Sequence, residues 1–125
     1  MRFHPARSPA EAYWVADPIF PPTGPRISCF FKAGSEGPTA DQVALFQRFV
    51  ARYPSLWQAI EPLLLQAQRG SAAPGFTLAF VSFPDRETAD MRWELTYECE
   101  AEPDTDYTVE MRGWMPGGQV QVERF

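Results

Sequence analysis

Residues 93–99 read WELTYEC, and this stretch alternates without exception between large or apolar side chains and polar ones. Successive side chains of a β-strand point to opposite faces, so the first, third, fifth and seventh residues would share one face. Residues 107–111, YTVEM, repeat the alternation. The two stretches therefore predict an antiparallel hairpin with one buried face and one solvated face.

The register of this hairpin can be predicted, because residues opposite each other must lie on the same face of the sheet. We expect Cys99 to face Tyr107 and Glu94 to face Arg112 across an odd-numbered loop. The Glu94–Arg112 pair would be a surface salt bridge that contributes at most about 1 kcal/mol. It therefore serves as a marker of register.

Three further strands are expected. Residues 26–32 alternate, and residues 76–83 are apolar on both faces, as in a central strand. Residues 119–125 follow Pro116, Gly117 and Gly118, which are typical of a turn. Together with the hairpin, these segments predict an antiparallel sheet of about five strands.

A pair of helices is predicted between the first two strands. Thr39 and Gln42 have the spacing of a capping box, which favours a helix over residues 40–52. Pro54 can end that helix and begin another over residues 55–69, which Pro62 should kink. Gly70 stands where a left-handed C-cap would be expected.

The sequence thus predicts the α+β class, with the helical pair packed on one face of the antiparallel sheet. Residues 1–125 would form a single domain, in which residues 26–125 are the globular core. Residues 1–25 are rich in proline and predict an extended arm packed on that core, with a short edge strand near residues 13–16.

Composition bounds the function. A net charge of -5 argues against binding nucleic acid through phosphates, and no apolar run is long enough to cross a membrane. With no recognisable secretion signal, we expect a cytoplasmic protein in which Cys29 and Cys99 are buried and reduced. His4 is the single histidine, no common catalytic motif is present, and we expect no cofactor and no metal site.

Seven acidic residues lie between Arg92 and Arg112 with no basic residue among them, and we call this set the acidic hairpin. They are Glu94, Glu98, Glu100, Glu102, Asp104, Asp106 and Glu110. One interpretation is a solvated sheet face whose charges discourage aggregation. A second is a docking surface for a basic protein. A third uses Glu102, Asp104 and Asp106 as calcium ligands, although Pro103 intervenes and the glycine of an EF-hand loop is missing.

The leading functional prediction is a non-enzymatic, protein-binding domain that uses the acidic hairpin. The alternative is a small-ligand-binding protein or an enzyme with an apolar pocket between the arm and the helices, lined by Trp14, Phe20 and Trp57. A structural or self-associating role is the third possibility.

Residues 38–42, with the pattern Pro-Thr-x-x-Gln, the helical pair and the strands after it resemble small uncharacterised bacterial α+β domains. Some of these domains are regarded as immunity proteins of toxin systems. The resemblance covers about the last two thirds of the chain and implies an immunity-like role. It carries over no site residues, and the arm has no counterpart in it.

Overall fold

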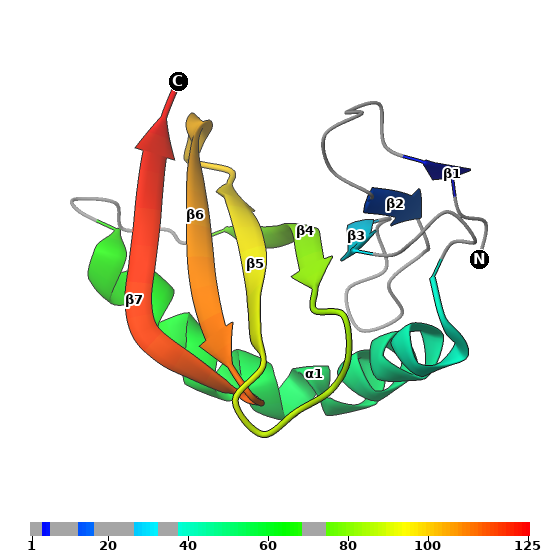
Figure 1. Cartoon of the computed structure of the whole chain (residues 1–125). Coiled ribbons are helices and arrows are strands. Elements are labelled where there is room, and N and C mark those ends of the chain that lie inside the picture. Colours follow the sequence, from blue (N-terminus) through cyan, green and yellow to red (C-terminus); the bar gives the residue numbers. More distant parts are fainter. Residues whose placement is uncertain (1–3, 6–12, 17–26, 33–37, 69–74) are drawn as a thin grey trace.

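The structure is a computed structural model that describes residues 4–5, 13–16, 27–32, 38–68 and 75–125. One helix and seven strands follow one another along the chain. They are β1 (His4–Pro5), β2 (Tyr13–Ala16), β3 (Ser28–Lys32), α1 (Ala40–Ala67), β4 (Phe76–Phe83), β5 (Arg92–Cys99), β6 (Glu102–Arg112) and β7 (Met115–Arg124). The strands form one sheet in sequence order, and α1 lies along one side of it (Figure 1).

The predicted helical pair is wrong, because α1 is one continuous helix of 28 residues. Pro54 and Pro62 both lie inside it and are exposed, so neither proline ring takes the place of a core side chain. Tyr53, Leu56 and Ile60 stay buried across this region. Burial of that stripe offsets the cost of about 3 kcal/mol that a proline imposes within a helix.

The predicted antiparallel sheet is also wrong, because β3 and β4 pair in parallel while the other neighbouring strands pair antiparallel. The error follows from the helix. Two antiparallel helices would have returned the chain to the end of β3 that it left, whereas one helix carries it to the other end. Parallel neighbours need such a crossover connection.

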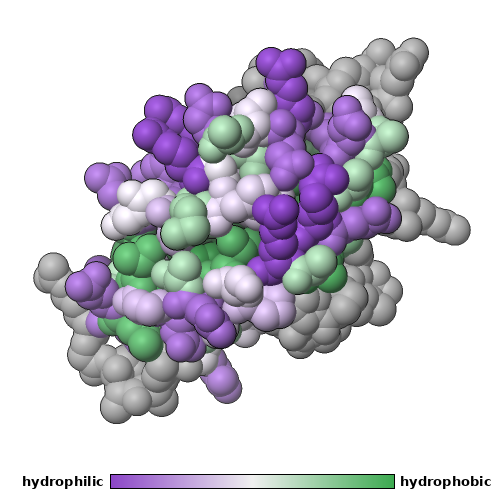
Figure 2. Space-filling model, turned by 90° about the horizontal axis from the view of Figure 1, so that it is seen from below, coloured by the Kyte–Doolittle hydropathy of each residue, from purple (hydrophilic) through white to green (hydrophobic). Residues whose placement is uncertain are grey.

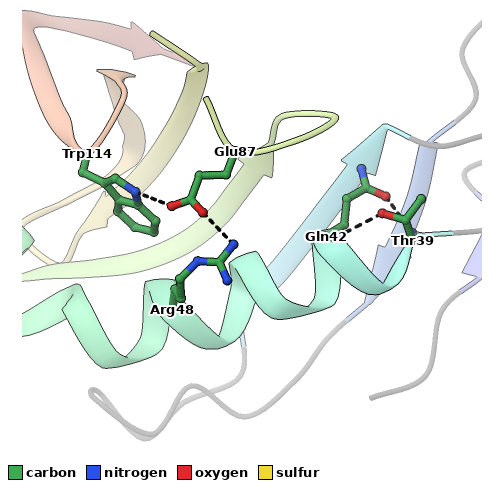
Figure 3. A network of polar contacts seen from close by, with 5 residues as sticks. All are labelled: Thr39, Gln42, Arg48, Glu87 and Trp114. Atoms are coloured by element: carbon green, nitrogen blue, oxygen red, sulfur yellow. Dashed lines mark hydrogen bonds and ion pairs between the residues drawn. The ribbon is translucent and has the colours of Figure 1, made fainter. Parts of the chain in front are cut away.

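The start of α1 was predicted correctly. The Thr39 hydroxyl accepts a hydrogen bond from the Gln42 amide at 3.2 Å, and the Gln42 side chain accepts one from the Thr39 amide at 3.0 Å (Figure 3). Gln42 also donates to the Pro84 carbonyl at 3.4 Å, which ties the helix start to the end of β4. The helix ends at Ala67 with Gln68 as its C-cap, and the predicted cap at Gly70 lies outside the described residues.

The core lies between α1 and one face of the sheet. The predicted inward residues of β5 and β6 are buried, and β4 has the predicted bounds. The largest fully buried side chains are Tyr97, Tyr107, Phe31, Phe49, Ile27, Leu45, Ile60, Leu64, Leu78, Leu95 and Met111. Seen from below, hydrophobic residues also reach the surface, in a larger area at the left of the view and in smaller ones at its right (Figure 2).

The hairpin register is shifted by two residues from the prediction. Tyr97 faces Tyr107, and Glu94 faces Glu110 instead of Arg112. The shift arises because β6 begins at Glu102, directly after the turn, so residues expected in a loop belong to the strand. The predicted Glu94–Arg112 salt bridge is therefore not formed.

A polar cluster fastens the loop between β4 and β5 to α1 (Figure 3). Glu87 forms a salt bridge with Arg48 at 2.7 Å and accepts a hydrogen bond from the Trp114 indole at 2.7 Å. The Arg52 guanidinium lies 4.5 Å from the centre of the Trp114 ring. These contacts also hold the turn between β6 and β7 against the helix.

Three other predictions concern the ends of the chain and the cysteines. The segment near residues 13–16 is a strand, as predicted, but it pairs with both β1 and β3 and is not an edge strand. Apart from β1, the rest of the predicted arm lies outside the described residues. Cys29 and Cys99 are buried thiols, as expected. Within the part of the chain that the structure describes, no helix is long and apolar enough to cross a membrane.

Candidate functional site

The side of the sheet opposite α1 carries acidic side chains in facing positions. Glu94 pairs with Glu110 between β5 and β6, and Glu98 pairs with Asp106. Asp106 in turn faces Glu123 of β7. We call these five residues, Glu94, Glu98, Asp106, Glu110 and Glu123, the acidic face. Like charges directly opposite each other destabilise a sheet, so this arrangement works against the fold.

Neutral and basic pairs complete the pattern on the same face. Thr96 and Thr108 face each other between the two acidic pairs, with their hydroxyl groups 3.0 Å apart. Arg92 and Arg112 face each other at the end of the hairpin. Every outward-facing pair between β5 and β6 thus carries two like charges, except the pair of threonines. Among the described residues, the salt bridge between Arg48 and Glu87 is the only one, so none joins these arginines to the acidic face.

The acidic hairpin predicted from the sequence divides into two groups. Glu94, Glu98, Asp106 and Glu110 come together on the acidic face. Glu100 lies in the turn and donates its backbone amide to Gly75, and Glu102 accepts a hydrogen bond from the hydroxyl of the buried Tyr107. Asp104 is exposed, and its carbonyl accepts a hydrogen bond from Phe125.

Glu123 is the member of the acidic face that the sequence reasoning missed. It lies outside the hairpin in the sequence, and only the pairing of β6 with β7 brings it next to Asp106. The alternation of residues 119–124 was the available signal, since a third strand beside the hairpin places its odd-numbered side chains on the acidic side.

A hollow of about 700 Å³ opens at the Arg92 end of the hairpin. Its lining includes Glu94 and Glu110 of the acidic face, and Asp85 and Asp90 from the loop between β4 and β5. Arg86 and Arg92 also line it, so carboxylates outnumber basic groups four to two. A hollow with this excess of acidic groups suits a cationic side chain.

Calcium binding by Glu102, Asp104 and Asp106 finds no support in the geometry. No group of three or more acidic, cysteine or histidine side chains within the described ranges is arranged to hold a metal ion. Glu102 is engaged with Tyr107, whereas Asp106 faces Glu98 on the outer side.

The alternative pocket of Trp14, Phe20 and Trp57 can be located only in part. Trp14 lies in β2, opposite Phe31, and Phe20 lies outside the described residues. Trp57 is half-buried, and its ring lies 6.3 Å from that of Tyr53 and 5.6 Å from that of Tyr97.

Three buried tyrosines titrate far from their ordinary range. Burial raises the pKa of Tyr53 to about 12, against a smaller lowering by its hydrogen bond to Tyr97. Burial and then the nearby Tyr53 raise the pKa of Tyr97 well above its usual value. Burial and then the Glu102 carboxylate raise the pKa of Tyr107 to about 12. All three are therefore neutral at physiological pH.

Searches of protein-family models, of curated proteins and of solved structures found no match to this chain. The function has to be argued from the acidic face and its surroundings.

Proposed function

We propose that this chain is a non-enzymatic binding protein whose acidic face docks on a basic protein. The observation that carries the proposal is the facing of like charges, Glu94 with Glu110 and Glu98 with Asp106. Each such pair costs the fold a few tenths to about 1 kcal/mol relative to a neutral pair. A partner that brings lysine or arginine side chains to these positions would remove this cost on binding.

The pattern differs from that of a merely solvated face. Surfaces that serve solubility intersperse both signs of charge, because neighbouring opposite charges avoid a large single-sign field. Here the two arginines face each other at one end, and carboxylates face each other at two of the other three outward pairs of the hairpin. A single-sign field on a rigid sheet accelerates encounter with an oppositely charged partner and fixes its orientation.

The hollow beside Glu94 and Glu110 gives this surface a shape as well as a charge. A lysine or arginine of the partner that enters the hollow would meet four carboxylates and two arginines, Arg86 and Arg92, so acidic groups still outnumber basic ones around it. Because some of the small bacterial domains that residues 38–42 resemble are regarded as immunity proteins, the partner we propose is a basic toxin that this binding neutralises.

Charge reversal tests the proposal without unfolding the chain. In a Glu98→Lys variant the new lysine faces Asp106, so an attractive pair replaces a repulsive one and the fold becomes more stable. The matched control is Glu61→Lys, which makes the same change of charge at an exposed position of α1. The native chain and both variants would be immobilised and used to capture proteins from a lysate of the source organism.

We expect the native chain and the Glu61→Lys variant to retain a basic protein that the Glu98→Lys variant loses. Binding of the purified partner should weaken as salt is added, because exposed charges are screened. Equal capture by all three forms would contradict the proposal, as would the absence of any basic protein from the native sample.

A further inference from the structure

β7 forms an edge of the sheet, and it is long and open. Among the described strands it pairs only with β6 (Figure 1). None of its ten residues is buried, whereas buried and less buried residues alternate in β5 and along most of β6. An open edge presents unpaired amide and carbonyl groups to any strand that can align with it.

The part of β7 after its glycines has few of the features that prevent an edge strand from pairing with another chain. Residues 119–124 read QVQVER, with no proline and no lysine. Irregular pairing with β6 is confined to the other half of the strand, between Val109 and Met111 of β6. Natural edge strands are usually interrupted by prolines, bulges or lysines, so this segment remains open to a partner strand.

A groove runs beside this open segment on the helix side. It has a volume of about 330 Å³ and is lined by Gln66 and Ala67 of α1 and by Val120, Val122 and Arg124 of β7. Val120 and Val122 are half-buried against the core. A strand added next to β7 would place alternate side chains in this groove, as in proteins that bind a peptide by extending a sheet.

We propose that the occupant of this edge is β7 of a second copy of the chain, paired antiparallel about a two-fold axis at Gln121. Facing residues share a sheet face in this register, because an even-numbered residue meets an even-numbered one. On the helix side Val120 faces Val122 of the second copy. On the other side Gln121 faces its own counterpart, and Gln119 faces Glu123. No like charges face each other.

The glycines of the second copy lie near the bulky C-terminal residues in this arrangement. Arg124 and Phe125 would lie beside Gly118 and Gly117, where the positive φ of Gly118, 91°, ends the regular part of the strand. Phe125 is 78% exposed, one of the most exposed large apolar side chains among the described residues. An aromatic side chain beside an edge glycine covers the backbone that the glycine leaves bare. Self-complementarity of this kind is what a two-fold interface requires.

The concentration dependence of the mass in solution tests this inference. Sedimentation equilibrium of the native chain should move from 14.2 kDa towards twice that mass as concentration rises. A Gln121→Lys variant places two lysines opposite each other at the axis and should raise the dimer Kd at least about tenfold. The matched control, Gln119→Lys, makes the same charge change on the same face and places the lysine opposite Glu123, so its Kd should be unchanged or lower.

A second measurement does not depend on fold stability. A Gln121→Cys variant should form a disulfide-linked dimer under mild oxidation, because the two cysteines meet at the axis while Cys29 and Cys99 are buried. A Gln47→Cys variant on the exposed side of α1 should not. A native chain that stays monomeric at every concentration would overturn the proposal. A dimer that survives Gln121→Lys unchanged would overturn it too, since its interface would lie elsewhere. The outcome is independent of the docking proposal for the acidic face.

Discussion

The hydroxyl groups of Tyr53 and Tyr97 lie 2.7 Å apart in the core and join α1 to β5. The two residues are 5% and 0% exposed. A buried hydroxyl that loses its hydrogen bond retains its full desolvation cost. Positions of the helix that separate the two hydroxyl groups are therefore less stable, and the contact helps to fix the position of α1 on the sheet.

Replacing Tyr53 with phenylalanine should therefore lower the free energy of unfolding by about 1–3 kcal/mol, because the Tyr97 hydroxyl loses this partner. The Tyr53→Phe, Tyr97→Phe double variant should lose less than the sum of the two single variants. Urea unfolding of the four proteins measures the coupling. Strict additivity would show that the hydrogen bond contributes nothing to stability.

The buried tyrosines also predict how stability depends on pH. The ordinary pKa of tyrosine is 10.0, whereas burial raises that of Tyr53 and Tyr107 to about 12 and that of Tyr97 well above its usual value. Above pH 10 the unfolded chain would release these protons while the folded chain keeps them. The free energy of unfolding should therefore be unaffected by these groups below pH 10 and fall steadily as pH rises through about 12.

A spectroscopic titration that measures tyrosinate checks this prediction when unfolding is followed in the same samples by circular dichroism. Tyrosinate from the three buried residues should appear only above pH 10 and together with unfolding. The Tyr97→Phe variant should lose stability less steeply over the same range. Ionisation of all tyrosines near pH 10 in a chain that is still folded would contradict the assignment.

The sequence predicted local structure well where the pattern of side chains decides it. The alternation of residues 93–99 and the Thr39 and Gln42 cap led to correct elements, because burial and capping act over a few residues. Pro54 led to a wrong prediction of two helices, because its local preference is outweighed by the packing of the residues around it. The wrong prediction of an antiparallel pairing between β3 and β4 followed from that error, because neither strand encodes the direction of its neighbour.

The candidate site was predictable in composition and not in geometry. The excess of acidic residues is visible in the sequence, but the facing of Glu98 with Asp106 depends on a register set by a short turn and a bulge near Cys99. The sequence reasoning assumed a longer loop, which paired Glu94 with Arg112 and concealed the repulsion. Glu123 required knowledge of how β7 pairs with β6.

The turn between β6 and β7 should depend on Gly113. This residue has φ 57°, and a Cβ there would lie 2.4 Å from the Ala89 carbonyl oxygen. A Gly113→Ala variant should lose more than about 1 kcal/mol of stability, from backbone strain and from displacement of the loop between β4 and β5.

Gly118 supplies the matched control for that substitution. It also has a positive φ, of 91°, but a Cβ there would meet nothing within 4 Å. A Gly118→Ala variant should therefore show the backbone strain alone and remain the more stable of the two in thermal unfolding. Equal losses would mean that the contact with Ala89 relaxes freely.

The acidic face should make the stability of the chain depend on salt. At low ionic strength Glu94 repels Glu110, and Glu98 repels Asp106. Added salt weakens this repulsion, because ions screen exposed charges, with a Debye length of about 10 Å at 0.1 M. We expect Tm to rise by a few degrees between low and moderate concentrations of sodium chloride.

The Glu98→Lys variant should start from a higher Tm, and its Tm should rise less with salt, because one repulsive pair has become attractive. The Glu61→Lys variant separates this effect from that of net charge, since it makes the same change of charge away from the sheet. If both variants respond to salt alike, the repulsion is spread over the whole molecule, and the facing carboxylates impose no strain for a basic partner to relieve.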